Sequence, residues 1–305
     1  DNLPENGHVT RATMLGLARL IDADLAQWIG ANVAFPNSMV DCITPATSDR
    51  ERQLLRERFR LDDTAPVVCE PFRQWVMEDD FPAGRPRLEE VGVEFVSDVA
   101  AHELMKLRIL NGGHAAIAYP GALLGHHFVH DAMSDPDVAA FLRHLTRREV
   151  IPTLAPIQGV DFDAYFQVVE ERFANPEVGD TVPRLCLDGS NRQPKFILPT
   201  LRDRLRAGAS IDGLALEVAL WCRYCAGTGE AGEAIEIADE RRDELRERAT
   251  AARDRPEAFL EMASVFGDLA ANPLFSAAFA EALAAIWRGG VREALAAYAG
   301  ARVSG

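Results

Sequence analysis

The sequence predicts a mainly α-helical protein in which an α/β segment precedes an all-helical region. Residues 65–77 and 91–99 are rich in valine and phenylalanine, which is typical of short strands. From residue 100 onward, apolar side chains recur at spacings of three and four, which indicates successive amphipathic helices. Hydrophobic residues make up 48% of the chain, so it can form a sizeable core.

The α/β segment is expected to begin with helices. The first is predicted over residues 14–29, with Thr10 as a candidate cap. FPNSMVD at 35–41 is interpreted as a loop because of its proline and asparagine. The charged stretch 48–59 predicts a second helix, and a loop with two prolines at 78–90 separates the two predicted strands.

The helical region is predicted to begin near residue 100, where we place the domain boundary. Residues 100–125 should form one long helix that is interrupted at Tyr119-Pro120-Gly121. Further helical patterns follow at 137–157, 162–175, 197–209, 212–225, 237–254, 256–271 and 273–300. Two domains, residues 1–100 and 101–305, are therefore expected.

Charge and composition narrow the possible partners and the compartment. With 32 basic and 47 acidic residues the net charge is −15, which disfavours nucleic acid and anionic membrane surfaces. No apolar run of about 18 residues and no leader-like opening is evident, so a membrane segment is not expected. The five cysteines are scattered, as expected for reduced thiols of a cytoplasmic protein. Cys222 and Cys225 form a CxxC inside an apolar pattern, which favours core packing over metal binding.

Two apparent ligand motifs are interpreted as structural. GTGEAG at 227–232 matches GxGxxG, but a helix rather than a strand precedes it, and its acidic residues would repel a diphosphate. We therefore expect a glycine-rich helix end there. The cluster of His126, His127, His130 and Asp131 has the residue types of a metal site. It lacks the glutamate that a hydrolytic zinc motif places between its histidines, so a partly exposed helix surface is favoured.

The segment HELMKLRILNGGH carries the strongest catalytic pattern. On an uninterrupted α-helix, Glu103, Lys106 and His114 would lie within an arc of about 80°, and Asn111 would extend it to about 140°. A lysine on an apolar helix face is desolvated, and desolvation favours its neutral form, which can accept a proton. Asn111 is a neutral donor for a developing alkoxide, and Gly112-Gly113 would permit close approach of a ligand. The alternative is a lysine that extends its amine to solvent beside a helix kink.

Five motifs occur in the order of one known family. DNLPENG at 1–7, FPNSMVD at 35–41, KLRILNGGH at 106–114, YPGALLG at 119–125 and RLCLDGSNRQPKF at 184–196 resemble the mannitol dehydrogenase family of long-chain polyol dehydrogenases. The resemblance implies the end of a Rossmann-type α/β coenzyme domain, followed by a helical substrate-binding and catalytic domain. The family's dinucleotide fingerprint belongs upstream of DNLPENG, which suggests that this chain is part of a longer polypeptide.

The resemblance also implies a role for each matching residue. Lys106 would take the hydroxyl proton as hydride leaves, and Asn2 and Asn111 would hold the oxygen. Glu103 would pass the proton to water. The substrate's other hydroxyl groups would be bound by Asp41, His114, Arg184 and Arg192. Cys42 stands where many relatives have arginine, which puts any role of that arginine in doubt.

The expected reaction is metal-independent oxidation of D-mannitol, or a similar hexitol or pentitol, to the ketose. NAD is the expected acceptor and NADP remains open, while residues that bind the coenzyme are not identified. One alternative is reduction of hexuronates such as fructuronate or tagaturonate, with Arg184 or Arg192 bound to the carboxylate. Another is a helical module that binds sugar without a coenzyme and without catalysis.

Overall fold

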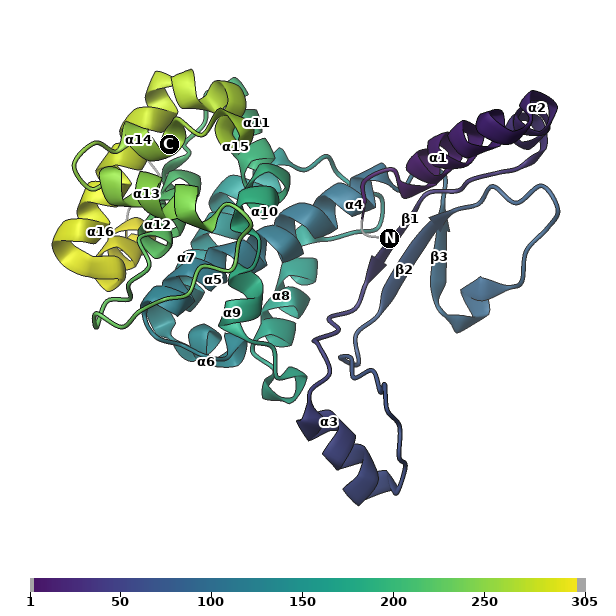
Figure 1. Cartoon of the computed structure of the whole chain (residues 1–305), viewed down its shortest axis with the longest axis horizontal. Coiled ribbons are helices and arrows are strands. Elements are labelled where there is room, and N and C mark those ends of the chain that lie inside the picture. Colours follow the sequence, from purple (N-terminus) through teal and green to yellow (C-terminus); the bar gives the residue numbers. More distant parts are fainter. Residues whose placement is uncertain (1–2, 301–305) are drawn as a thin grey trace. The chain divides into compact units, whose positions relative to one another are not determined.

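The structure, a computed structural model, describes residues 3–300 and divides into two compact units. Unit 1 extends to Lys106 and unit 2 begins at Leu107. Unit 1 combines helices with a small sheet, whereas unit 2 is built from helices (Figure 1). The predicted fold class, a mainly helical chain with an α/β segment first, is confirmed.

Unit 1 contains a three-stranded sheet with the order β1-β2-β3. Strand β2 (Gln74–Glu78) pairs antiparallel with β1 (Ser38–Asp41) and parallel with β3 (Val93–Val96). The two strands predicted from valine and phenylalanine are thus present, although β2 occupies only the end of the predicted stretch. The loop predicted at FPNSMVD is wrong, because its last residues form β1. Met39 of that strand is buried against Val76, which explains the pairing.

The helices that precede the sheet differ from the prediction in two respects. Helix α1 (Asn6–Ile21) begins before Thr10, whose hydroxyl donates to the Asn6 carbonyl inside the helix and caps nothing. The single predicted helix is divided at Asp22, which is extended. The Asp22 carboxylate accepts hydrogen bonds from the first N–H groups of α2 (Ala23–Asn32), so it starts a new helix.

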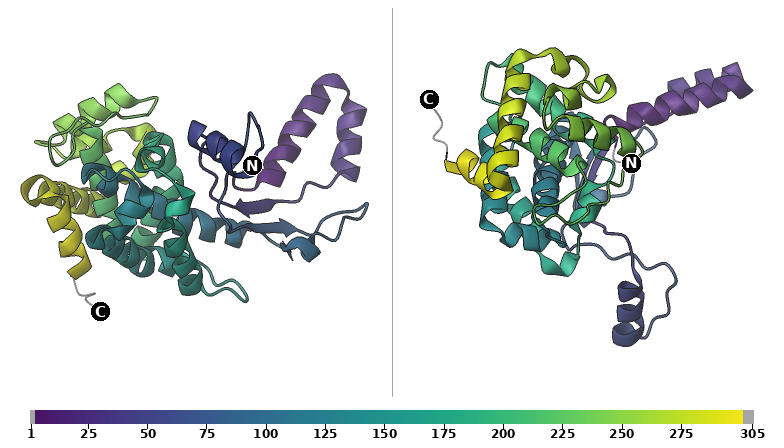
Figure 2. Two further views of the ribbon diagram at one scale, coloured as in Figure 1. Left: turned by 90° about the horizontal axis from the view of Figure 1, so that it is seen from below. Right: turned by 60° about the vertical axis from the view of Figure 1, so that its left-hand side comes forward.

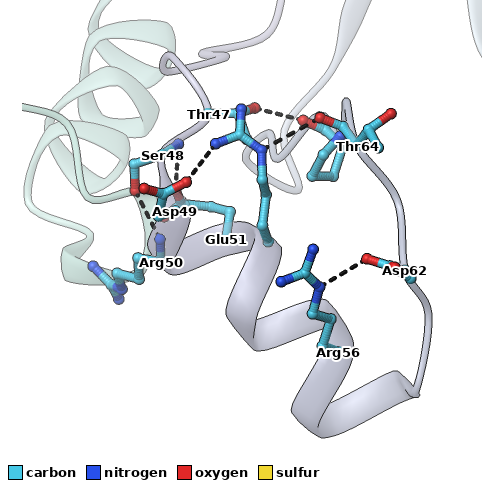
Figure 3. Close-up of polar contacts among 10 residues, drawn as sticks. Thr47, Ser48, Asp49, Arg50, Glu51, Arg56, Asp62 and Thr64 are labelled. Carbon is cyan, nitrogen blue, oxygen red and sulfur yellow. Dashed lines mark hydrogen bonds and ion pairs between the residues drawn. The ribbon is translucent and has the colours of Figure 1, made fainter.

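The predicted charged helix is confirmed as α3 (Asp49–Leu54), which continues into a π-helical turn η1 (Leu55–Phe59). Ser48 and Glu51 form a capping box at its start, because the Glu51 carboxylate accepts the Ser48 N–H and the Ser48 hydroxyl accepts an N–H of the first turn (Figure 3). After η1, Arg56 Nε forms an ion pair with Asp62 Oδ1 at 2.7 Å, which ties the segment that follows the helix back to it (Figure 3). No residue of α3 or η1 is buried, so hydrogen bonds and ion pairs of charged side chains hold this segment.

The long helix predicted over 100–125 is irregular, but not where expected. It comprises α4 (Ala100–Lys106), a π-helical turn η3 (Leu107–Asn111) and α5 (Gly112–Leu123). The interruption predicted at Tyr119-Pro120-Gly121 is wrong, since α5 continues through Pro120. The neighbouring residues Tyr119 and Leu123 are fully buried, and this packing holds the helix together despite the proline.

Unit 2 is built from helices (Figure 2). Beyond α5 they are α6 (Val129–Ser134), α7 (Pro136–Leu145), α8 (Phe162–Phe173), α9 (Val182–Cys186), α10 (Gly189–Phe196), α11 (Leu198–Arg206), α12 (Asp212–Cys225), α13 (Arg242–Ala251), α14 (Glu257–Leu260), α15 (Ala263–Phe266) and α16 (Pro273–Gly300). Helix α12 is buried along its whole length after Asp212 and packs against α5, α7, α13 and α16. Cys222 and Cys225 lie in this core, as predicted.

Helix α16 is the one helix within residues 3–300 that is long and apolar enough to cross a membrane, judged by length and composition alone. The expectation that no such run exists is therefore corrected. The alanine-rich sequence contains few charges, and the core helix of a soluble protein meets the same criterion. Its large side chains Phe275, Phe279, Leu283 and Ile286 are buried within unit 2, so this face of the helix packs inside the protein.

Candidate functional site

In unit 1, the predicted base and proton relay lie on α4. Lys106 ends this helix and is only 5% exposed. Glu103, one turn earlier, is 8% exposed and accepts the Glu5 N–H at 3.3 Å. Burial raises the pKa of Glu103 above its ordinary value. A buried lysine thus follows, by three residues, a carboxyl group that holds its proton more tightly than usual.

The π-helical turn η3 separates Lys106 from Asn111 and changes the expected geometry. The uninterrupted α-helix assumed for Glu103, Lys106, Asn111 and His114 is therefore not present, because Leu107–Asn111 is π-helical. Asn111 ends the turn, and its side-chain oxygen Oδ1 is buried without a hydrogen-bond partner among the described residues. Such turns are frequent at functional sites.

Asp41 and Asn2 are the other predicted site residues of unit 1. Asp41 is the last residue of β1, opposite Gln74 of β2, and is 4% exposed. Asn2 lies outside the described residues. The segment that follows it is nevertheless fixed at Asn37, whose side-chain oxygen accepts the Gly7 N–H at 2.9 Å.

Sequence reasoning missed the role of Asn37, which lies inside the FPNSMVD motif. Its amide nitrogen donates to Glu78 Oε1 at 2.9 Å, and its backbone N–H donates to Glu78 Oε2 at 2.8 Å. The side chain is 5% exposed and joins the start of α1 to β1 and β2. The sequence alone could not indicate this link, because residues 35–41 were interpreted as a loop and the burial of Asn37 beside a strand was not predicted.

In unit 2, His114 and the two glycines before it line the first turn of α5. The His114 ring stacks on Phe173 with centroids 4.3 Å apart. A Cβ on Gly113 would lie 3.2 Å from the Phe173 ring, a tight contact, so glycine at this position lets α8 approach. A Cβ on Gly112 would lie at an ordinary contact distance of 3.5 Å from the Phe196 carbonyl. The close approach of a ligand to these glycines stays a prediction.

Arg184 and Arg192 come from the neighbouring helices α9 and α10. Arg184 forms a two-nitrogen ion pair with Asp180, a buried carboxylate that the sequence analysis did not identify. Arg192 donates to the carbonyl oxygens of Arg184 at 3.3 Å and Leu185 at 3.0 Å, near the end of α9. Helix α9 packs on α5, and α10 packs on η3. The fold of unit 2 thus gathers the elements that carry Asn111, His114 and both arginines.

The glycine-rich segment 227–232 has a structural role, as predicted. Helix α12 precedes it, and Gly227 has a left-handed φ of 80°. Glu230 of this loop accepts the Val291 N–H at 3.0 Å, where α16 is kinked at Gly290. The loop therefore caps the second half of α16. Within residues 3–300 no strand leads through a glycine-rich turn into a helix, so the described residues do not fit the pyrophosphate of a dinucleotide.

The histidines of the predicted cluster contact different partners. His126 Nε2 lies 3.1 Å from Asp135 Oδ2, and His130 stacks on Phe128. In the part of the chain that the structure describes, no group of three or more histidine, cysteine, aspartate or glutamate side chains could hold a metal ion. The cluster thus contributes to the packing of α6 and the start of α7.

Two family models match most of the chain. Residues 98–287 match the mannitol dehydrogenase C-terminal domain, and residues 1–90 match the mannitol dehydrogenase Rossmann domain. The mannitol 2-dehydrogenase of Cereibacter sphaeroides is 55% identical over 97% of the chain, and that of Phaeosphaeria nodorum is 41% identical over 98%. The chain spans 62% and 53% of the lengths of these relatives.

Two solved structures are similar as well. A Pseudomonas fluorescens mannitol 2-dehydrogenase in a ternary complex with NAD and D-mannitol has a TM-score of 0.87 and 41% identity. A D-sorbitol dehydrogenase in substrate-free form has a TM-score of 0.89 and 34% identity. Each match covers 97% of this chain and 61% of the other one. The chain belongs to the mannitol dehydrogenase family.

Proposed function

We propose that the full-length protein oxidises D-mannitol, or a similar hexitol or pentitol, to the ketose with NAD as acceptor and without a metal. The observation that carries the proposal is the buried amine of Lys106 in a chain related to mannitol 2-dehydrogenases. The sequence contains two lysines, Lys106 and the exposed Lys195, so only one amine has a desolvated environment. Residues 1–100 would end the coenzyme domain, and 101–305 would form the substrate domain.

The proposed chemistry assigns a role to each predicted catalytic residue. Neutral Lys106 takes the proton of the secondary hydroxyl, because burial disfavours its charged form. Asn2 and Asn111 donate to the oxygen as it gains negative charge. Glu103 receives the proton and passes it to water, a role that its raised pKa supports because it can hold a proton closer to neutral pH. NAD, when bound, accepts the hydride.

The polar residues around the substrate favour a polyol over a hexuronate. Asp41, His114, Arg184 and Arg192 would bind the remaining hydroxyl groups. The charge of Arg184 is already balanced by Asp180. Arg192 has its Nη1 directed to backbone carbonyls. A substrate carboxylate would have to compete with Asp180 for Arg184, whereas a neutral hydroxyl group does not displace the ion pair.

Oxidation assays with the full-length protein test the proposal. NADH formation at 340 nm is expected with D-mannitol, D-sorbitol or D-arabinitol in the presence of a chelator. Preferential NADH consumption with fructuronate or tagaturonate would instead establish the hexuronate reductase. Polyol binding by calorimetry, with neither NADH binding nor turnover, would identify a non-catalytic sugar-binding module.

A further inference from the structure

A polar pair lies in the apolar core of unit 2, beneath α10. Glu217 of α12 is 0% exposed and Gln193 of α10 is 1% exposed. Gln193 Nε2 donates to the Glu217 carboxyl group at 2.7 Å. The remaining oxygens, Glu217 Oε2 and Gln193 Oε1, have no hydrogen-bond partner within residues 3–300. Burial of polar atoms that lack hydrogen-bond partners costs stability, so stability alone does not account for this pair.

Within residues 3–300, no ion pair joins Glu217 to a cationic side chain, and its side-chain hydrogen bond is the one with Gln193. Tyr119 of α5 lies close enough to Glu217 to interact with it electrostatically. Charged side chains that face α12 from other elements lie near its two ends. At its first turn Glu149 of η4 (Thr146–Val150) and Tyr298 of α16 hydrogen-bond each other, and beyond its last turn Arg246 of α13 approaches Gly227. Burial raises the pKa of Glu217 to about 8, so it is a carboxylic acid at neutral pH.

Helix α10 rests directly on this part of the core. A Cβ on Gly189, in its first turn, would lie 2.7 Å from Trp221 Nε1 and 2.9 Å from the Tyr119 hydroxyl. The close approach sets the height of the helix above α5 and α12. Ser190, in the same turn, bonds the Asp239 carboxylate through its N–H and its hydroxyl, each at 2.8 Å. The bond from Gln193 to Glu217 adds a constraint on the rotation of α10 about its own axis, because it attaches the buried face of α10 to α12.

Rotation of α10 determines where Arg192 lies. Arg192 immediately precedes Gln193 on the same helix. A rotation of α10 that moves Gln193 therefore also moves Arg192 about the helix axis. Its guanidinium also holds the end of α9, which carries Arg184, through two backbone carbonyls. The same helix contacts η3, where Asn111 ends the π-helical turn. A change at Glu217 would therefore be transmitted to these side chains.

We propose that Glu217 is a positioning residue for the polyol: its hydrogen bond to Gln193 fixes the rotation of α10 and thereby places Arg192 and Arg184. The inference rests on the proposed function, because that function makes the two arginines substrate contacts. Glu217 itself touches no substrate. A purely stabilising role would affect folding without a selective effect on polyol binding.

The test compares variants of the full-length protein in steady-state assays. Glu217→Leu is expected to raise KM for the polyol about fivefold or more, the factor that corresponds to one lost hydrogen bond of ~1 kcal/mol. The KM for NAD and kcat should change far less. Glu217→Gln keeps a neutral group that can bond Gln193 and should restore the KM. Glu149→Gln is the matched control, since Glu149 is a buried glutamate bound to α12 but not to α10.

The pH dependence of unfolding provides a second readout. The pKa of Glu217 is raised from 4.5 to about 8, so its contribution to stability is lost as pH rises across this interval. Glu217→Gln removes the titration, and its melting temperature relative to wild type should increase from pH 5 to pH 8 and then level off. If Glu217→Leu does not fold, the double variant Gln193→Leu/Glu217→Leu removes both polar groups and should fold with the raised KM.

The outcomes separate the two proposals. Wild-type protein that oxidises no polyol overturns the proposed function. The positioning role is overturned if the wild type is active and a folded variant, either Glu217→Leu or the double variant, has an unchanged KM for the polyol. An equal rise of KM in Glu149→Gln also overturns it, because any loss of core stability would then have the same effect.

Discussion

Arg184 is joined through two guanidinium nitrogens to the carboxylate of Asp180, four residues before it and 5% exposed. The pair fixes Arg184 within α9 and balances its charge before any substrate binds. Asp180 also accepts the Thr181 N–H at 2.9 Å, so the carboxylate is itself held by the backbone. Such a two-pronged pair has a defined geometry that a single bond lacks.

Asp180→Asn should therefore weaken polyol binding. The loss of a charge-assisted hydrogen bond is worth about 1.5–3 kcal/mol, so KM should rise about tenfold or more. Steady-state kinetics with D-mannitol measures it. Asp163→Asn is the control, because it breaks the more exposed pair of Asp163 with Arg147. An equal KM in both variants would show that the pair does not position Arg184.

Lys106→Ala should abolish turnover while the polyol still binds. A general base contributes about 10²–10⁴-fold to the rate, so kcat should fall by at least about 100-fold. Isothermal titration with the polyol, in the presence of coenzyme, measures the binding that remains. Lys195→Ala removes the only other lysine of the sequence, an exposed one, and should leave kcat near that of wild type. Full turnover by Lys106→Ala would refute the assignment of the base.

Asn37→Ala should destabilise unit 1. It removes the acceptor of the Gly7 N–H and the donor to Glu78, which leaves buried polar groups unpaired. The expected loss is about 1–3 kcal/mol in the free energy of unfolding, measured by chemical denaturation. Asn32→Ala, at an exposed residue that bonds only the Trp28 carbonyl in its own helix, should change it by less than about 0.5 kcal/mol. Equal effects would contradict the role of Asn37 as a buried link.

Gly189→Ala should destabilise unit 2, because the new Cβ would lie 2.7 Å from Trp221 Nε1 in a core that cannot yield. Overpacking of this kind costs about 1–3 kcal/mol, which a lower melting temperature would reveal. Gly16→Ala is the matched substitution. Nothing lies within 4 Å of its Cβ inside α1, and alanine there should stabilise the helix by about 0.5–1 kcal/mol. Stabilisation by both would show that α10 is less closely seated than the structure indicates.

The sequence by itself determined the properties that depend on local pattern. Periodicity of apolar residues predicted the helices of unit 2, and the charged segment 48–59 predicted α3. Motifs such as KLRILNGGH and RLCLDGSNRQPKF were sufficient to identify the family, because they keep their order over the chain. The buried environment of Lys106 also followed from the apolar residues around it.

Only the tertiary structure decided features that arise between distant segments. β1 forms because Met39 meets Val76, a contact that the local Pro and Asn signals conceal. Helix α5 continues through Pro120 because the packing of buried Tyr119 and Leu123 outweighs the missing N–H of proline. The π-helical turn at Leu107–Asn111 was not predicted. The partners of Arg184, Asn37 and Gln193 likewise depend on how helices and strands approach one another. Local sequence encodes backbone preference, whereas burial and pairing are set by contacts that exist only in the folded chain.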